Sequence, residues 1–219
     1  MKEFMEKSMK GIIFDLDGVI VFTDKFHYQA WKQMADEMGI YFDEEINNRL
    51  RGVSRMESLS IILEKYEGEE LSLEKKRDLA EQKNKVYRKL LKTMTSQDVS
   101  KEVRETLEEL RKRGYKLAIG SSSQNAKMIL EQVDLIDAFD EISDGNNIVN
   151  SKPDPEVFLK AAEFLKLKPQ ECAVVEDAYA GIDAAKAGKM TAIAVGDAAS
   201  YSKSDIKLQK FEELLDYFH

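Results

Sequence analysis

The sequence predicts an α/β protein with a doubly wound parallel sheet and a small helical domain inserted after the first strand. Two observations lead to this fold class. Short, almost wholly apolar segments alternate with amphipathic helical patterns over most of the chain, as is typical of parallel strands covered on both faces. The stretch from 23 to 95, between the first two apolar segments, has helical periodicity and no convincing strand pattern.

The apolar segments are expected to be buried strands, because each is short and apolar at nearly every position. A weaker fifth candidate follows the second segment, at Phe139–Ile142. The four stronger candidates are Gly11–Phe14, Lys116–Ile119, Cys172–Val175 and Thr191–Val195.

Helical patterns separate these strands. The first places Val103, Leu107 and Leu110 on one face, and Gly114 is suited to end that helix. The helices expected around the sheet are Glu102–Lys112, Ala126–Val133, Pro155–Leu165 and Ile182–Ala187.

The insertion is expected to contain three helices, with breaks near Gly39, Gly52 and Gly68. We therefore expect a sheet domain formed by residues 1–22 and 96–219, and a helical cap formed by residues 23–95 over the carboxyl edge of the sheet. The expected cap helices are Ala30–Met38, Met56–Tyr66 and Leu73–Leu91.

Composition narrows the class of protein. The 219 residues, 43% of them hydrophobic, suffice for one domain with an insertion and argue against disorder. Lys+Arg 33 minus Asp+Glu 41 gives a net charge of −8, which argues against a nucleic-acid partner. Residues 23–95 hold 14 basic and 14 acidic residues, so the acidic excess lies in the remainder. The single Cys172 excludes an internal disulfide or a cysteine zinc site, and two histidines disfavour a histidine-rich one.

Targeting signals are not apparent. Met1–Lys10 lacks the apolar stretch of a secretory signal. No apolar run approaches the roughly 20 residues that a membrane span needs. We expect a cytoplasmic, monomeric protein with no membrane partner.

The strongest chemical signal is the segment Asp15-Leu16-Asp17-Gly18, directly after the first predicted strand. Alternate residues of a strand point the same way, so both carboxylates are expected to face one pocket. Close carboxylates favour either a bound cation or one protonated member. Such a pair can supply a nucleophile beside Mg²⁺ and a proton donor. The alternative is two acids that end a strand in an ordinary turn.

Three further features lie next to other predicted strands: hydroxyl groups and a pair of acids directly after a strand, and a lysine in the loop before one. Hydroxyl groups that follow a strand can cradle a phosphate, although serines there are also common helix caps. A lysine in a proline-bounded loop can neutralise a phosphoryl group, and adjacent acids after a strand suit an oxygen-ligand site for Mg²⁺. The residues concerned are Ser121, Ser122, Ser123 and Asn125, then Lys152, then Glu176 and Asp177.

Together these four motifs resemble those of the haloacid dehalogenase superfamily, whose core is a Rossmann-like sheet. The resemblance covers nearly the whole chain, because the insertion also fits that family's helical cap. A narrower resemblance is to its β-phosphoglucomutase subfamily, carried by DLDGVI at 15–20, His27, GVSR at 52–55 and SSSQN at 121–125. Val21-Phe22, Gln124 and Ala178 depart from that subfamily's usual residues.

The resemblance implies a role for each motif. Asp15 is then the nucleophile that becomes an aspartyl phosphate, and Asp17 is the general acid and base. Ser121 and Lys152 hold the transferring phosphoryl group. The cofactor is Mg²⁺, bound by Asp15, the backbone carbonyl of Asp17 and Asp177, with Glu176 in support.

The same resemblance extends to the substrate. A rigid, bidentate guanidinium suits a distal phosphate, which gives Arg55 that role. Gly52 and Val53 then bring backbone close to the sugar, and His27 couples cap closure to the alignment of Asp17. The remaining substrate-binding residues implied are Ser122, Ser123 and Asn125.

The implied activity is interconversion of β-glucose 1-phosphate and glucose 6-phosphate through β-glucose 1,6-bisphosphate. A sugar-phosphate phosphatase with the same motifs is the main alternative, and a dehalogenase is disfavoured by Asp17 and the Mg²⁺ acids. A phosphorylated receiver domain is disfavoured by the insertion and by Asp17. A binding protein without catalysis is disfavoured because every charged group of the motifs is present. The expected partner is a small sugar phosphate, with no nucleic acid.

Overall fold

The computed structural model describes residues 9–50 and 53–219. Within them, one six-stranded sheet has the order β3-β2-β1-β4-β5-β6, and every neighbouring pair is parallel. The predicted doubly wound parallel sheet is therefore confirmed. The strands are β1 (Gly11–Phe14), β2 (Lys116–Gly120), β3 (Glu141–Ser143), β4 (Cys172–Glu176), β5 (Thr191–Ala194) and β6 (Ile206–Lys207).

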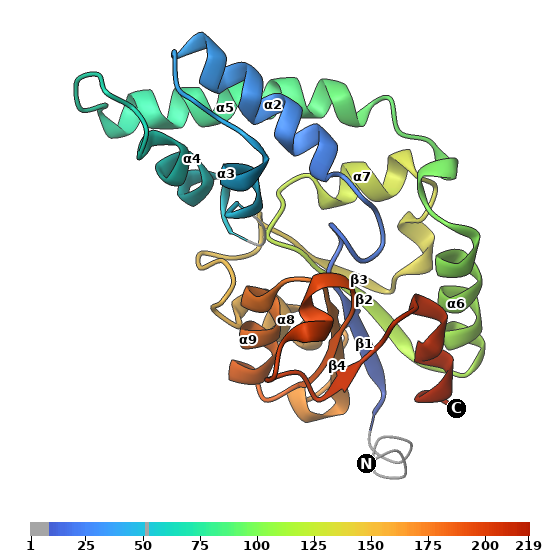
Figure 1. The fold of residues 1–219 in the computed structure, drawn as a ribbon. Coiled ribbons are helices and arrows are strands. Elements are labelled where there is room, and N and C mark those ends of the chain that lie inside the picture. The colour runs from blue at the N-terminus through green and yellow to red at the C-terminus, as the bar shows by residue number, and fades with distance from the viewer. Residues whose placement is uncertain (1–8, 51–52) are drawn as a thin grey trace.

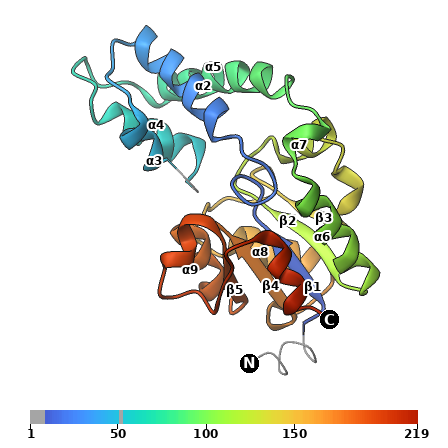
Figure 2. The same ribbon diagram turned by 45° about the vertical axis from the view of Figure 1, so that its right-hand side comes forward.

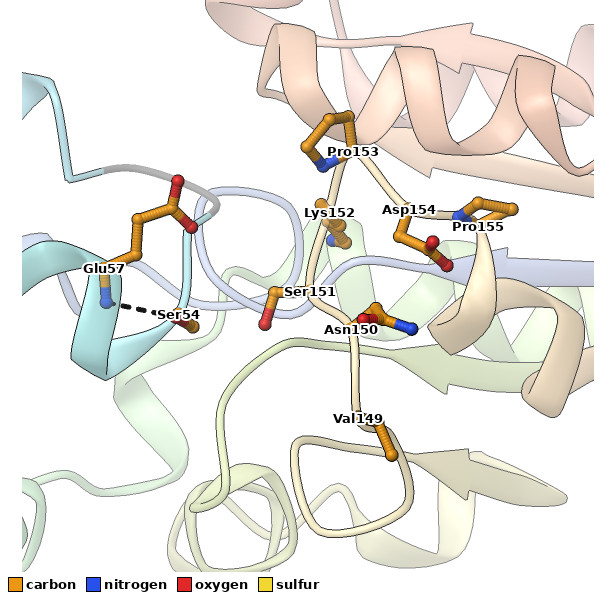
Figure 3. A pocket seen from close by; sticks show the side chains of 9 residues that line it. All are labelled: Ser54, Glu57, Val149, Asn150, Ser151, Lys152, Pro153, Asp154 and Pro155. Atoms are coloured by element: carbon orange, nitrogen blue, oxygen red, sulfur yellow. Dashed lines mark hydrogen bonds between the residues drawn. The ribbon is translucent and has the colours of Figure 1, made fainter.

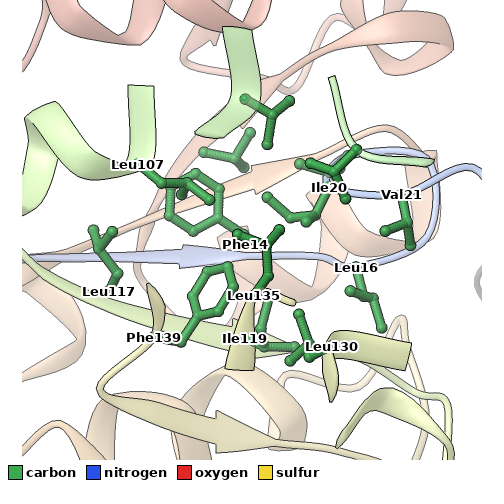
Figure 4. Packing of buried hydrophobic residues seen from close by; sticks show 14 of the residues in the cluster. Phe14, Leu16, Ile20, Val21, Leu107, Leu117, Ile119, Leu130, Leu135 and Phe139 are labelled. Carbon is green, nitrogen blue, oxygen red and sulfur yellow. The ribbon is translucent and has the colours of Figure 1, made fainter. Parts of the chain in front are cut away.

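Helices cover both faces of the sheet because successive strand residues point to opposite sides. In β1, Ile12 and Phe14 belong to one hydrophobic cluster and Ile13 to another. Figure 4 shows the first cluster packed around Phe14. The first face is covered by α6 (Lys101–Lys112) and α7 (Ala126–Gln132), and the second by α8 (Glu156–Phe164) and α9 (Tyr179–Ala187).

Of the α-helices between β1 and β2, the first four lie together beyond the carboxyl edge of the sheet, at the top of Figures 1 and 2. They enclose a third hydrophobic cluster, which includes Trp31, Leu59, Ile62 and Leu79. We call them the insertion helices: α2 (Asp24–Glu37), α3 (Glu44–Asn48), α4 (Arg55–Leu63) and α5 (Leu73–Leu91).

The insertion helices are joined to the sheet by packing as well as by the chain. Phe26 and Ala30 of α2, and Tyr87 and Leu91 of α5, belong to the same cluster as Phe14. The start of α2 and the end of α5 therefore belong to the hydrophobic core of the sheet. We call this shared packing of Phe26, Ala30, Tyr87 and Leu91 the joint. The insertion helices meet the carboxyl edge of the sheet beside it.

Several elements differ from the sequence prediction. β6 and α3 were not predicted, α2 begins at Asp24 rather than at Ala30, and β3 is Glu141–Ser143 rather than Phe139–Ile142. The elements β3, β6 and α3 have only two to five residues, which are too few to show a periodic pattern. Gly114 has φ of 88° after α6, the left-handed conformation expected of it. No helix in the described part of the chain is long and apolar enough to cross a membrane.

Candidate active site

The site lies where three neighbouring strands end. β1 pairs with β2 on one side and with β4 on the other. Asp15 therefore follows β1, Ser121 follows β2 and Glu176 ends β4 along one edge. Ligands of open α/β sheets bind at this carboxyl edge.

Lys152 joins two of these motifs. Its Nζ donates to Asp15 Oδ1 at 2.5 Å and to Glu176 Oε2 at 2.7 Å, and the residue is only 2% exposed. Burial acts to lower the pKa of Lys152, but the charges of Asp15 and Glu176 outweigh it and hold that pKa above its ordinary value. The ammonium group therefore stays charged beside Asp15.

Three carboxylates form a cluster that could hold a metal ion. One oxygen from each of Asp15, Glu176 and Asp177 lies within 4.8 Å of the others. Burial raises the pKa of Asp15 to about 7, although the charge of Lys152 lowers it. Burial, followed by the charges of Glu176 and Asp15, raises the pKa of Asp177 to about 8. A hard divalent cation fits this oxygen donor set and would offset the repulsion.

Two glycines make room for this cluster. A Cβ built on Gly18, which has φ of 88°, would lie 2.1 Å from Asp177 Oδ2. A Cβ on Gly181 in α9 would lie 1.8 Å from Glu176 Oε2. Glu176 also accepts backbone N–H groups of Asp177 and Ala178 through Oε1. Both carboxylate oxygens of Glu176 thus already accept hydrogen bonds, which fits support of the site better than a leading ligand role.

Asp17 has a partner different from that of Asp15. Its carboxylate accepts a hydrogen bond from the Thr23 hydroxyl, and Thr23 is fully buried at the start of α2. Burial raises the pKa of Asp17, while the Thr23 hydroxyl and the charges of Lys152 and Lys83 lower it. The side chain of Asp17 is not a member of the three-carboxylate cluster.

The loop after β2 presents hydroxyl groups in a fixed backbone. Ser121 Oγ accepts the N–H of Ser123, and Ser123 Oγ accepts the N–H of Asn125. Ser122 Oγ is buried and has no hydrogen-bond partner in the described part of the chain. A buried hydroxyl without a partner is costly unless a ligand or water satisfies it, so this loop is suited to a polar ligand.

The insertion helices carry a basic group of side chains close to Asp17. Lys83 Nζ lies 2.9 Å from His27 Nδ1 and 4.6 Å from the centroid of the Trp31 ring. Burial and the charges of Lys83 and Arg55 lower the pKa of His27 well below its ordinary value. Burial and Arg55 likewise lower the pKa of Lys83 to about 7, against the charge of Asp17.

Figure 3 shows a cavity between the start of α4 and the segment that holds Lys152. It has a volume of about 610 Å³, and its walls are Ser54 and Glu57 on one side and residues 149–155 on the other. Arg55 follows Ser54 as the first residue of α4 and pairs with Glu81 of α5 at 3.2 Å. A small molecule could therefore reach Lys152 between the insertion helices and the sheet.

All but one of the site residues predicted from the sequence lie in the described part of the chain. Val53 lies just before α4, and Gly52 lies outside the described residues. The predicted site residues did not include Thr23, Lys83 or Asn84. The sequence placed Thr23 on one helical face with His27 and gave Lys83 and Asn84 only cap contacts within a mostly solvated stretch. Lys83 and Asn84 are buried polar residues of α5, and the signal for them is two polar residues beside Leu79 and Tyr87 on the apolar face.

Residues 12–195 match the family of haloacid dehalogenase-like hydrolases, and the chain belongs to this family. The chain is 38% identical to a β-phosphoglucomutase of Bacillus subtilis over 96% of its own length and 94% of the relative. It is 33% identical to a phosphorylated carbohydrates phosphatase of Thermotoga maritima, over 81% of each protein. The crystal structure of a β-phosphoglucomutase from Clostridium difficile superposes with a TM-score of 0.88 at 38% identity, covering 94% of this chain and 93% of that one.

Proposed function

We propose that this protein is a phosphomutase that interconverts β-glucose 1-phosphate and glucose 6-phosphate through an aspartyl-phosphate enzyme. The observation that carries the proposal is the Asp15–Lys152–Glu176 arrangement at the carboxyl edge. The similarity to β-phosphoglucomutases, which extends over nearly the whole chain at 38% identity, supports the same proposal. Residues 23–95 act in this proposal as the cap, and residues 1–22 and 96–219 as the core.

The Asp15 carboxylate attacks one phosphorus atom of the 1,6-bisphosphate, the bond from that phosphorus to the sugar oxygen breaks, and a sugar monophosphate leaves. Asp17 donates the proton to that oxygen, which its raised pKa favours. Lys152 and Ser121 hold the phosphoryl oxygens, and Lys152 offsets their charge. In the other half-reaction Asp17 removes the proton from the free hydroxyl of a sugar monophosphate. The oxygen of that hydroxyl attacks the phosphorus on phosphorylated Asp15, the bond from phosphorus to the Asp15 carboxylate oxygen breaks, and the 1,6-bisphosphate forms.

Mg²⁺ is the proposed cofactor, and Asp15 and Asp177 are its proposed side-chain ligands, with the backbone carbonyl of Asp17. When bound, it neutralises charge on the phosphoryl group during transfer. Glu176 orients Lys152 and the backbone N–H groups of Asp177 and Ala178.

The non-transferring phosphate is assigned to the basic side of the insertion helices. Arg55 takes that phosphate, because a guanidinium binds two of its oxygens at once. Ser122, Ser123 and Asn125 line the opposite side, together with backbone of Gly52 and Val53. His27 acts through Lys83 and Thr23, which connect the cap to Asp17.

The proposal is tested by a coupled assay of glucose 6-phosphate formation from β-glucose 1-phosphate, Mg²⁺ and a trace of the 1,6-bisphosphate. We expect sustained turnover with little release of inorganic phosphate. Asp15→Asn should lower this turnover by at least about 10³-fold, because it removes the nucleophile. Net phosphate release from several sugar phosphates would instead identify a phosphatase, and near wild-type turnover by Asp15→Asn would refute the mechanism.

A further inference from the structure

A buried hydrogen bond joins the insertion helices to the loop after β2. Asn125 Nδ2 donates to Asn84 Oδ1 at 2.9 Å. Asn84 lies in α5 and is 6% exposed, and Asn125 directly precedes α7 and is 9% exposed. The bond therefore crosses from the insertion helices to the sheet side of the molecule beside the candidate site.

The backbone of this loop is held in place from the sheet side. Gly145 N donates to Ser123 O at 3.1 Å, and Asn146 Nδ2 donates to Gln124 O at 3.0 Å. A Cβ on Gly145 would lie only 2.5 Å from Ser122 O, so the two loops are in close contact. The loop backbone is thus held from the sheet side and not by α5. The bond to Asn84 therefore acts on the side chain of Asn125 rather than on the loop backbone.

Asn84 also shares its helix with the groups near Asp17. Lys83 is its neighbour and reaches His27, and Tyr87 stacks on the His27 ring with centroids 4.0 Å apart. The helix is rigid over this distance, so the position of Asn84 also sets the positions of Lys83 and Tyr87. The bond to Asn125 thus links the loop after β2 with the surroundings of Asp17.

The energetics of an amide pair suit a contact that forms and breaks. When the helices separate, both amides can bond to water, so the net gain of the bond is small. When the helices approach with one partner missing, the other amide stays buried and unsatisfied, which is costly. The pair therefore favours the arrangement in which Asn84 and Asn125 are bonded, which we call the closed position of the insertion helices. It does not prevent these helices from separating from the loop.

We propose that Asn84 is a positioning residue for phosphoryl transfer, which fixes the closed position of the insertion helices by orienting the amide of Asn125. The second amide proton of Asn125 remains available to an oxygen of the sugar phosphate. This inference rests on the proposed function, since it gives the closed position a role in transfer to a sugar rather than to water.

The first experiment compares three variants in the mutase assay. Asn84→Ala should lower kcat/KM about tenfold, mainly through kcat, and should increase the share of phosphoenzyme that loses phosphate to water. Asn84→Asp keeps an acceptor oxygen and should stay within about threefold of wild type. Gln82→Ala, which removes an exposed amide of the same helix, is the matched control and should be unchanged. Equal losses in Asn84→Ala and Asn84→Asp would overturn the inference.

The second experiment does not depend on activity. Spin labels at the exposed positions Lys89→Cys in α5 and Lys127→Cys in α7 report the distance across the bond, and the native Cys172 is buried. In Mg²⁺ and inorganic phosphate we expect one narrow distance distribution, broadened by Asn84→Ala and restored by Asn84→Asp. An unchanged distribution in Asn84→Ala would overturn the inference. If the wild-type protein shows no mutase turnover, the proposed function is overturned. The distance measurement would still decide whether Asn84 fixes the position of the insertion helices.

Discussion

Charge at the level of single residues explains why the site suits a cation. Asp15, Glu176 and Asp177 contribute three negative charges when ionised, and Lys152 contributes one positive charge within 2.7 Å of two of them. One lysine leaves an excess of two negative charges in a buried place. Burial is the main cause of the raised pKa values of Asp15 and Asp177, and the charges of the neighbouring carboxylates raise them further. A divalent cation would balance this excess of negative charge.

These pKa values predict a pH dependence of the free energy of unfolding. Carboxyl groups of an unfolded chain titrate near pH 4, whereas Asp15 and Asp177 titrate near 7 and 8 in the fold. The folded state thus binds more protons in this window, so the metal-free protein should lose stability as the pH rises from about 5 to about 8. Mg²⁺ needs the ionised carboxylates, so its stabilisation should grow over the same range.

Thermal denaturation with and without Mg²⁺ across this pH range measures the effect. The difference between the two curves removes contributions from groups far from the site. Asp177→Asn serves as the comparison variant and should lose most of the Mg²⁺-dependent increase in Tm. An increase of the same size at pH about 5 and at pH about 8 would contradict the prediction.

At the level of elements, α2, α4 and α5 gather basic side chains on the side facing Asp17. Arg55 opens α4, His27 lies in α2 and Lys83 lies in α5. Burial is the main cause of the lowered pKa values of His27 and Lys83. Repulsion from Lys83 and Arg55 lowers the pKa of His27 further, and repulsion from Arg55 lowers that of Lys83. An anion bound there would relieve this repulsion, which the exposed Glu81 does only in part at 3.2 Å from Arg55.

Arg55→Ala should therefore impair the mutase reaction more than simple phosphate-ester hydrolysis. We expect kcat/KM for β-glucose 1-phosphate to fall about 100-fold, as for loss of charged hydrogen bonds. Hydrolysis of p-nitrophenyl phosphate, which has no distal phosphate, should change by less than about threefold. Arg55→Lys keeps the charge without the bidentate geometry and should be intermediate. Equal losses for both substrates would favour the phosphatase alternative.

For the whole molecule, three hydrophobic clusters define how the parts are held. Two lie on the faces of the sheet, and the third lies among the insertion helices. Phe26 and Tyr87 extend the first-face cluster into the joint. The insertion helices therefore have a core of their own but keep an apolar attachment to the sheet beside the site.

Leu59→Ala tests this division. Leu59 is fully buried in the third cluster, so the substitution should cost about 2–5 kcal/mol within that cluster. Hydrogen exchange should accelerate mainly in residues 31–80, with little change in β1 and β4. Leu107→Ala is the matched control in the first-face cluster and should produce the opposite pattern. A uniform acceleration across the chain in Leu59→Ala would contradict two separately packed parts.

Much of the fold could be predicted because its signals are local. β1 and β4 are continuous apolar runs, and α6 shows both its periodicity and its terminal Gly114. β6 and α3 are too short to carry such signals. In α5, Lys83 and Asn84 lie in a lysine-rich stretch that was expected to be mostly solvated, because periodicity does not tell which polar residues a second part of the molecule will cover.

The sequence by itself determined the fold class and the order of the motifs, from Asp15 through Ser121 and Lys152 to Glu176 and Asp177. This was possible because strand ends and their following residues are set by neighbours in the chain. Only the tertiary structure decided the partners: Lys152 bonds Asp15, Thr23 bonds Asp17, and Asn84 meets Asn125 across 41 positions. Hydrogen bonds act over about 3 Å, and only the packing of helices and sheet brings residues so distant in sequence within that range.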